Sequence, residues 1–228
     1  LHLAYAYAGS AGKYNPLISD RHKWDNTIAI DQCETVANKF PKSSWANAAK
    51  NFESSLIRTS VTLQTEEVNS VNKPFRVLVK FKNILGLNFR VIRIGDNFMD
   101  KLNSLSDSKS QSDYIGALPY VQQFYQKIPD DGDYQTHAAE IKIPALKSGN
   151  YLIVGCTDEN FSGTSKFLVY AFTKVSDLAF FRNQNYSNSN GELFVTDRNS
   201  GAPQKNVTVY QYEKKYNYKK QLYEKNHT

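Results

Sequence analysis

The sequence has few of the residues that build cysteine-rich or disordered proteins. Its two cysteines, Cys33 and Cys156, lie far apart and in different expected elements. A disulfide between them therefore cannot be argued from the sequence, and a cysteine-rich metal site is excluded. Methionine occurs once, while glycine and proline are ordinary in number. This composition excludes collagen-like, low-complexity and wholly disordered chains.

Long apolar runs are also missing. No stretch approaches the roughly 20 apolar residues that a membrane-spanning helix needs, and no charged-then-apolar segment at the start resembles a signal peptide. The chain begins at Leu1 without a methionine, directly in a helix-like stretch over residues 1–8. We therefore expect a piece of a larger protein that is cut at both ends, in which any signal would lie outside this segment.

The charge is positive but spread out. The net charge of +6 permits binding to nucleic acid or an anionic surface. Lysine and arginine are scattered at strand-like spacing, however, and the one local enrichment is the Tyr/Lys stretch over residues 210–225. No nucleic-acid-binding module is recognisable, so we expect no nucleic-acid partner. A hydrophobic fraction of 40% provides enough apolar surface for a folded core.

The first 59 residues have helical spacing. Over residues 20–58, apolar side chains recur at steps of mostly three and four, and Pro41 divides the pattern into two helices. Ser43 or Ser44 can cap the second helix, and the short turn predicts an antiparallel hairpin. The predicted contact stripes are Trp24, Ile28, Cys33, Val36, Ala37 and Phe40 on one helix and Trp45, Ala48, Ala49, Phe52 and Leu56 on the other. A tetratricopeptide-like hairpin fits residues 1–59, although the 34-residue period is not repeated.

After Thr59 the apolar period changes to two. Apolar and polar residues alternate over residues 61–65, 75–82 and 87–91, which predicts half-buried antiparallel strands. Further strands are expected over residues 137–143, after the turn before Tyr151, and over 166–175. Residues 60–175 are therefore expected to form one sandwich domain.

Two intervening segments are less regular. Residues 103–113 contain almost no apolar side chains and predict an exposed, mobile loop. Residues 114–127 carry short apolar runs around Pro119, for which helix and strand are equally favoured.

The remaining residues, 176–228, predict the start of a second sandwich. Strands are expected over residues 193–197 and 207–212, with one more over 216–223. The sequence between Arg198 and Pro203 predicts a turn in which Gly201 takes a positive φ.

Several candidate sites have a simpler structural interpretation. The acidic turn Asp130-Asp131-Gly132-Asp133 has calcium-like oxygen ligands but lacks the later ligands of an EF-hand, the twelfth position being Ile141. An Asx-type turn is the better interpretation. The four histidines are dispersed, without a metal-ligand spacing, and are expected to be surface or partly buried structural residues: His2, His22, His137 and His227.

No catalytic constellation is present. A Gly-x-Ser-x-Gly elbow is absent, and Glu66-Glu67, as neighbours on a strand, would point to opposite faces and not share a substrate. Glu67 is expected on a solvated face. We therefore predict no catalytic, cofactor-binding or metal-binding residues and no cofactor, and expect that the chain is not an enzyme.

Aromatic residues offer one more candidate. A stacking platform for single-stranded nucleic acid could be built from Tyr210, Tyr212, Tyr216, Tyr218 and Tyr223 with Lys214, Lys215, Lys219 and Lys220. The same spacing suits a strand with tyrosines on one face and lysines protecting an edge, which we favour. Trp24 and Trp45 are expected to pack in the helical core.

Three stretches resemble bacterial alpha-2-macroglobulin family proteins. LKSGNYLIVG, residues 146–155, resembles the segment before a core strand of macroglobulin-like domains. KVSDLAFFRN and GELFVTDRNSGAPQKNVTVYQYE, residues 174–183 and 191–213, are similar to the junction between two such domains. With the helical lead-in, Asp133-Tyr134-Gln135 and residues 140–144, the chain is most similar to the large Bacteroidetes versions.

This resemblance implies a mainly β fold: an immunoglobulin-like macroglobulin domain preceded by a helical hairpin and followed by part of a second. It implies a structural fragment of a large extracytoplasmic protease trap, periplasmic or on the cell surface and lipid-anchored in the parent. The expected partners are neighbouring domains and, through the parent, proteases; the membrane is reached only through an anchor outside the fragment.

The chain departs from the family's reactive motif. The thioester of many members is formed by Cys-Gly-Glu-Gln, whereas Cys33 precedes Glu34 and Cys156 precedes Thr157. Neither cysteine forms a thioester on this pattern. The alternative function is a surface sandwich module that binds carbohydrate or another ligand through its aromatic residues.

Overall fold

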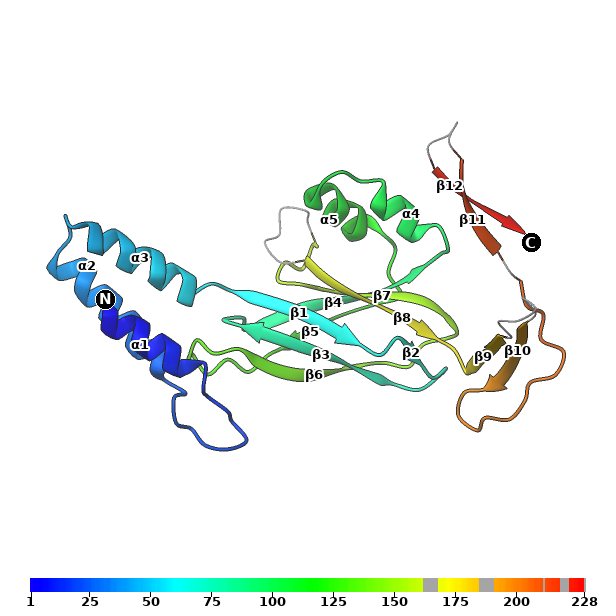
Figure 1. The fold of residues 1–228 in the computed structure, drawn as a ribbon, viewed down its shortest axis with the longest axis horizontal. Coiled ribbons are helices and arrows are strands. Elements are labelled where there is room, and N and C mark those ends of the chain that lie inside the picture. Colours follow the sequence, from blue (N-terminus) through cyan, green and yellow to red (C-terminus); the bar gives the residue numbers. More distant parts are fainter. Residues whose placement is uncertain (162–167, 185–190, 211, 218–221, 228) are drawn as a thin grey trace. The chain divides into compact units, whose positions relative to one another are not determined.

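The computed structural model describes residues 1–161, 168–184, 191–210, 212–217 and 222–227. The chain divides into two compact units, Leu1–Val175 and Ser176–Thr228. The first unit contains both the helical lead-in and the sandwich, and the second consists of paired strands (Figure 1).

Three helices form the amino-terminal module: α1 (His2–Ala11), α2 (Asp25–Lys39) and α3 (Ser44–Leu56). α2 and α3 run antiparallel on either side of the break at Pro41, as predicted (Figure 1). Ser43 caps α3, its side chain accepting a hydrogen bond from the Ala46 N–H at 3.2 Å. This bond satisfies one of the donors that every helix start leaves without an intrahelical partner.

The helical core is built from small residues, and the predicted role of the tryptophans is wrong. Ala29, Cys33 and Ala49 are fully buried, so the helices approach closely. Trp24 and Trp45 are instead 49% and 59% exposed. A narrow interface lined by alanine has no room for an indole ring, and apolar periodicity alone did not show which apolar residues of each helix face inward.

Two sheets form the sandwich. The smaller has the order β1-β3-β6 and is antiparallel; its strands are β1 (Ser60–Thr65), β3 (Phe75–Lys82) and β6 (His137–Ile143). The larger has the order β2-β8-β7-β4-β5; its strands are β2 (Val68–Asn69), β8 (Leu168–Val175), β7 (Gly149–Cys156), β4 (Gly86–Ile94) and β5 (Gln122–Lys127). Only the short β2–β8 pair among these is parallel.

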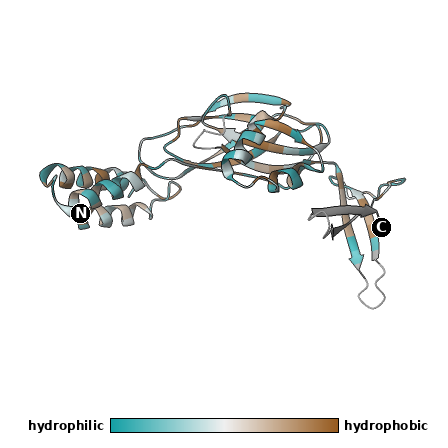
Figure 2. Ribbon diagram, turned by 90° about the horizontal axis from the view of Figure 1, so that it is seen from above, coloured by the Kyte–Doolittle hydropathy of each residue, from teal (hydrophilic) through white to brown (hydrophobic). Residues whose placement is uncertain are grey.

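The predicted alternation places one face of each sheet in a shared core. Val77, Val79 and Phe81 from β3 pack with Phe89 and other residues of the larger sheet. Lys80, between two of these residues, is exposed, as a strand period of two requires. Figure 2 shows the apolar stretches of the first unit gathered along these strands.

The expectation of a mobile loop over residues 103–113 is wrong, because helices occupy most of this stretch. α4 (Phe98–Asn103) and α5 (Ser108–Ala117) lie on the outer face of the larger sheet. Phe98 and Ile115, which flank the polar stretch, are buried against Ile92 and Leu152. The low apolar content of residues 103–113 therefore marks the solvent side of a helical layer, and the ambiguous residues 114–127 divide between the end of α5 and β5.

The fold is consequently mixed rather than mainly β: antiparallel sheets in a sandwich, with helices before it and over one face. The helices α4 and α5 cover the second face of the larger sheet. Successive residues such as Leu152, Ile153 and Val154 are therefore all buried, without alternation. Strands covered on both faces lose the alternating pattern.

The described residues of the second unit include two antiparallel ribbons. β9 (Leu178–Gln184) pairs with β10 (Gly191–Asp197), and β11 (Tyr212–Asn217) pairs with β12 (Leu222–His227). The predicted strand over residues 193–197 is therefore confirmed within β10. The strand expected over 207–212 is wrong for its described residues 207–210, which form no strand.

The turn after β10 has the predicted conformation at Gly201, whose φ is +72°. Asp197 holds this turn, since its Oδ1 accepts from the Asn199 and Ser200 backbone N–H groups at 3.0 and 2.8 Å. The returning chain pairs with β10 briefly at the Thr196–Pro203 bridge. Two hydrogen bonds flank this bridge, from the Asp197 N–H to the Ala202 carbonyl and from the Gln204 N–H to the Val195 carbonyl. The turn is therefore determined by its own residues. A returning strand would need more backbone hydrogen bonds with β10 than this segment makes.

Candidate functional site

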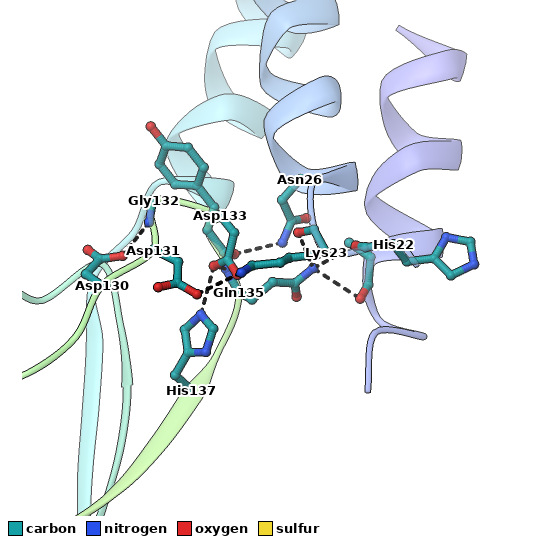
Figure 3. Close-up of polar contacts among 11 residues, drawn as sticks. His22, Lys23, Asn26, Asp130, Asp131, Gly132, Asp133, Gln135 and His137 are labelled. Atoms are coloured by element: carbon teal, nitrogen blue, oxygen red, sulfur yellow. Dashed lines mark hydrogen bonds and ion pairs between the residues drawn. The ribbon is translucent and has the colours of Figure 1, made fainter. Parts of the chain in front are cut away.

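A polar cluster joins the helical module to the sandwich (Figure 3). Its centre is the loop before β6, in which the Gly132 N–H donates to Asp130 Oδ1 and the Gln135 N–H to Asp133 Oδ1, both at 2.9 Å. These bonds confirm the predicted Asx-type turn. Within the described ranges, no group of three or more His, Cys, Asp or Glu side chains could hold a metal ion.

Side chains cross the junction in both directions. Asn26 at the start of α2 donates from Nδ2 to the Tyr134 carbonyl at 2.7 Å. Gln135 donates from Nε2 toward the carbonyls of His22 and Lys23 at 3.1 and 3.2 Å. These carbonyls directly precede α2, and the His22 carbonyl also accepts from the Asp25 N–H at 3.4 Å. The sandwich loop therefore adds hydrogen bonds to backbone groups at the start of α2.

An ion pair lies beside these bonds. Lys23 Nζ is 2.8 Å from Asp131 Oδ2. The hydrogen bond with Lys23 lowers the pKa of the Asp131 carboxyl, and the same bond raises the pKa of Lys23. The Asp131 side chain is 51% exposed and the Lys23 side chain 19%. Solvent reaches the pair from the Asp131 side, so it orients the loop more than it stabilises it.

Tyr134 makes an apolar contact between the sandwich and the helical module. Its side chain packs against the buried cluster formed by all three helices. Its backbone has φ +55°, a left-handed conformation that is rare for a bulky residue. The helical core is therefore completed by a side chain from the sandwich, held by an unfavourable backbone conformation that the surrounding contacts must offset.

Asp133 is the buried charge of the cluster. Its side chain is 1% exposed, and its Oδ1 lies 2.8 Å from His137 Nε2. No hydrogen-bond partner for its Oδ2 occurs in the described part of the chain. Burial lowers the pKa of nearby Lys82, and the negative charge of Asp133 opposes that shift. Two ionisable side chains thus sit in a poorly solvated position at the module boundary.

The remaining predicted site residues are not brought together. His22 pairs with Asp25 at 2.7 Å and His137 with Asp133, whereas His2 is exposed. The structural roles expected for His22 and His137 fit these pairs; the side chain of His227 lies outside the described residues.

Other predictions concern the strands and cysteines. Glu66 and Glu67 lie between β1 and β2 rather than on one strand, and both are exposed, as expected for Glu67. Their carbonyls accept from Thr173 Oγ1 and the Lys174 N–H. Cys33 and Cys156 are not joined in a disulfide and are buried in separate clusters. In the Tyr/Lys stretch, the strand expected over residues 216–223 is wrong, because residues 216–217 end β11 and residues 222–223 begin the antiparallel β12. Tyr210 is 66% exposed, and the side chains of residues 212–225 lie outside the described residues.

A groove of about 310 Å³ lies on the outer face of the larger sheet, next to α4. Its apolar wall is formed by Ile94, Phe98, Met99 and Phe172. Its polar rim is formed by Glu67, Asp96, Asn150 and Lys174. This groove could not be predicted from the sequence, because its residues come from separated elements that only the helical layer brings together.

The β9–β10 ribbon exposes large apolar side chains on both faces. Phe180 is 74% exposed and lines a hollow of about 730 Å³ with Val195 and residues 207–210. On the opposite face, the rings of Phe181 and Phe194 stack with centroids 4.8 Å apart and are 55% and 42% exposed. Exposed aromatic surface of this kind is typical of contact sites between proteins.

The comparisons with known proteins identify no family. No protein-family model matches the chain, and no curated protein matches it. Among solved structures, the CARDB domain of a Pyrococcus furiosus protein, in complex with di-metal ions, has 13% identity and a TM-score of 0.29, covering 52% of this chain and 88% of that one.

Two other solved structures are similarly distant. The sulfur carrier protein SoxY of Chlorobium limicola has 12% identity and a TM-score of 0.23, covering 57% of this chain and 98% of its own. The DNA-bound alkylpurine DNA glycosylase AlkC of Pseudomonas fluorescens has 8% identity and a TM-score of 0.25, covering 75% and 52%. Scores this low carry no argument about function.

None of the helices in the described ranges has the length and apolar content needed to cross a membrane.

Proposed function

We propose that this chain is a non-catalytic, structural part of a large bacterial alpha-2-macroglobulin-like protein of the Bacteroidetes type, which acts as an extracytoplasmic protease trap. In this proposal residues 60–175 form an immunoglobulin-like macroglobulin domain, and residues 176–228 begin the next one. The main support for this proposal is that the β9–β10 ribbon exposes large apolar side chains on both faces.

An isolated two-stranded ribbon is only marginally stable in water. Phe180 and Val195 on one face, and Phe181 with Phe194 on the other, need covering from both sides. A second sandwich layer supplies one cover and a neighbouring domain the other. Function would then lie in surfaces between domains, as the resemblance of residues 174–183 and 191–213 to a domain junction implies.

The sandwich supports the same proposal. The order β1-β3-β6 against β8-β7-β4-β5 follows the order of strands in immunoglobulin-like sandwiches. In this proposal the sandwich is a structural module, and a helical module held to it by Tyr134 and Gln135 suits such a role. The partners proposed are neighbouring domains and, through the parent, proteases; the site of action is the periplasm or cell surface, with a lipid anchor in the parent.

The trap is tested on the full-length gene product. We expect that a broad-specificity protease, after cutting the parent, still hydrolyses a small peptide substrate but loses activity on a large protein substrate. Small-angle scattering should show compaction after cleavage, and a parent without residues 60–175 should provide no protection. Unchanged digestion of the large substrate by the protease, after complete cleavage of the parent, would contradict the proposal.

The groove beside α4 favours a second candidate function, binding of carbohydrate. Phe172 is 37% exposed and offers an apolar ring face, while Glu67, Asn150 and Lys174 offer both hydrogen-bond acceptors and donors around it. A volume near 310 Å³ lies at the lower end of the range for small-ligand sites, which begins at about 300 Å³. A sugar ring combines the apolar face and the hydroxyl groups that such a groove could hold.

Calorimetric titration with soluble polysaccharides tests this second function. If it holds, Phe172→Ala should weaken binding at least about tenfold, a loss of roughly 1.4 kcal/mol. Leu85→Ala, at a residue that is 70% exposed and outside the groove, should bind as the unaltered chain does. Absence of binding, or equal loss in both variants, would exclude the groove as a sugar site.

A further inference from the structure

β5 forms an edge of the larger sheet that lacks the usual protection against pairing. The sheet ends at β5, which pairs with β4 on one side. Natural sheets protect such an edge with charged residues, proline, a very short strand or a covering segment. Residues 122–126 of β5 include no charged residue and no proline. A row of backbone groups on β5 is therefore accessible for pairing with another strand.

The other edges of the sandwich have one of these protections. β6 ends the smaller sheet and exposes Glu140 and Lys142 along its length. β1 lies beside β8 of the larger sheet, which covers its outer edge. β2 is only two residues long. Within the part of the sandwich that the structure describes, β5 is thus the one long edge without such protection.

The hydrogen bonds around β5 determine which of its backbone groups face outward. The Ile128 N–H donates to the Leu85 carbonyl at 2.9 Å, so it points toward the β4 side. Because this direction alternates along an antiparallel strand, the backbone N–H and C=O groups of Gln123 and Tyr125 point away from β4. Alternating donors and acceptors of this kind are matched by the backbone of an extended peptide, which neither a helix nor a sugar presents.

The side chains next to this edge favour a peptide with apolar residues. Tyr120, Val121 and Tyr125 are 49%, 53% and 59% exposed. They extend the outer face of the sheet at its β5 end. An added strand would place every second side chain on this face, next to these residues.

Charge favours a partner protein over a second copy of the chain. The charged residue of β5 is Lys127 at its last position, and its carbonyl already accepts from Gln126 Nε2 at 2.9 Å. The net charge of +6 repels a second copy and attracts an acidic segment. We propose that β5 binds an extended, acidic segment of a partner protein as an added strand, through the backbone groups of Gln123 and Tyr125.

Selection on the full chain from a phage-displayed library of random peptides, each about ten residues long, tests the proposal. Selected peptides should alternate apolar and polar residues and carry a net negative charge. A synthetic copy of a selected peptide should slow amide hydrogen exchange at Gln123 and Tyr125. N-methylation of that peptide at alternate residues removes its N–H donors and should weaken binding at least about tenfold.

Gln123→Pro tests the edge within the chain. Proline removes an N–H that faces away from β4, so an edge strand tolerates it and the pairing with β4 is kept. Gln123→Ala is the matched control, because both variants remove the side-chain oxygen that accepts from Arg90 Nε at 2.7 Å. Peptide binding should fall at least about tenfold in Gln123→Pro and stay within about threefold of the unaltered chain in Gln123→Ala.

Several results would overturn the proposal. One is a library selection that enriches no peptide, or only basic ones. Another is equal binding to the two Gln123 variants or equal binding of the N-methylated peptide, since the peptide would then use another surface such as the β9–β10 ribbon. Self-association of the full chain that Gln123→Pro abolishes would also overturn it, because a second copy would then occupy the edge. If Gln123→Pro changes the far-ultraviolet circular dichroism, the N-methylated peptide and the amide exchange still decide the question on the unaltered chain.

Discussion

At the scale of single residues, the junction places two ionisable side chains where solvent is scarce. Asp133 has a carboxylate oxygen beside His137, and Lys82 lies at the end of β3 with its pKa lowered by burial. Each of these charges is partly offset by the other. The cluster therefore specifies how the loop sits between the modules at some cost to stability, as buried polar groups often do.

The lowered pKa of Lys82 gives stability a pH dependence. The folded chain binds this proton less tightly than the unfolded chain, whose lysine has the ordinary value of 10.5. Stability from this group therefore rises as pH increases from the folded pKa toward 10.5. We expect Lys82→Met to remove that rise in urea unfolding measured at alkaline pH, while Lys80→Met, on the same strand but exposed, keeps it. Equal pH slopes for Lys82→Met and the unaltered chain would refute this account.

Tyr134 provides a test of the apolar junction. Tyr134→Ala removes the sandwich's side chain from the helical core and should lower the free energy of unfolding by about 1–3 kcal/mol. Thermal melting followed by far-ultraviolet circular dichroism should show helices lost at lower temperature. Leu17→Ala, at a residue that is 94% exposed, should melt normally. An unchanged melt for Tyr134→Ala would mean that the helices are stable without the sandwich loop.

At the scale of elements, the layer formed by α4 and α5 decides which strands are buried on both faces. α5 approaches the loop after β7 closely, since a Cβ at Gly116 would clash with the Phe161 carbonyl. Arg90 secures this contact, donating from Nη1 to the Gly116 carbonyl at 2.9 Å and stacking with Phe161. Gly116 is therefore needed for space and not for helix formation.

Gly116→Ala should be destabilising even though alanine favours helices. Separation of α5 from the sheet is expected to cost about 1–3 kcal/mol, measured by denaturant unfolding. Gly95→Ala is the control, because a Cβ there would meet nothing within 4 Å. If both variants have the same stability as the unaltered chain, the close packing of α5 is not a constraint.

At the scale of the whole molecule, the chain consists of two units that differ in how complete their cores are. The first encloses the buried clusters of the helices and the sandwich, whereas the second exposes Phe180, Phe181 and Phe194. A module with few buried apolar contacts opens at low cost. The two units should therefore unfold separately.

Scanning calorimetry tests this division. Residues 1–175 alone should melt at the same temperature as the main transition of the full chain, because the first unit carries its own core. Residues 1–59 alone should be largely unfolded, since Tyr134 and Gln135 would be absent. A stable, helical 1–59 piece, or a lower melting temperature for 1–175, would contradict this division.

The strands of the sandwich could be predicted from the sequence because their pattern is local. Side chains alternate along β1, β3 and the start of β4, and Asp197 with Gly201 specifies its turn within a few residues. Polar spacing was misleading for α4 and α5, whose buried residues lie outside the polar stretch. The junction was missed because Asn26 and Tyr134 are 108 positions apart.

Apolar periods, helix caps and turns could be predicted from neighbouring residues alone, because local backbone geometry governs each of them. The sequence could not determine which apolar residues become core. Trp24 and Trp45 remain outside because alanines bring the helices too close, while Ile92 and Leu152 are buried because distant helices cover them. A side chain is buried when other segments of the chain pack over it. Those segments are distant in the sequence, so burial follows from the tertiary structure.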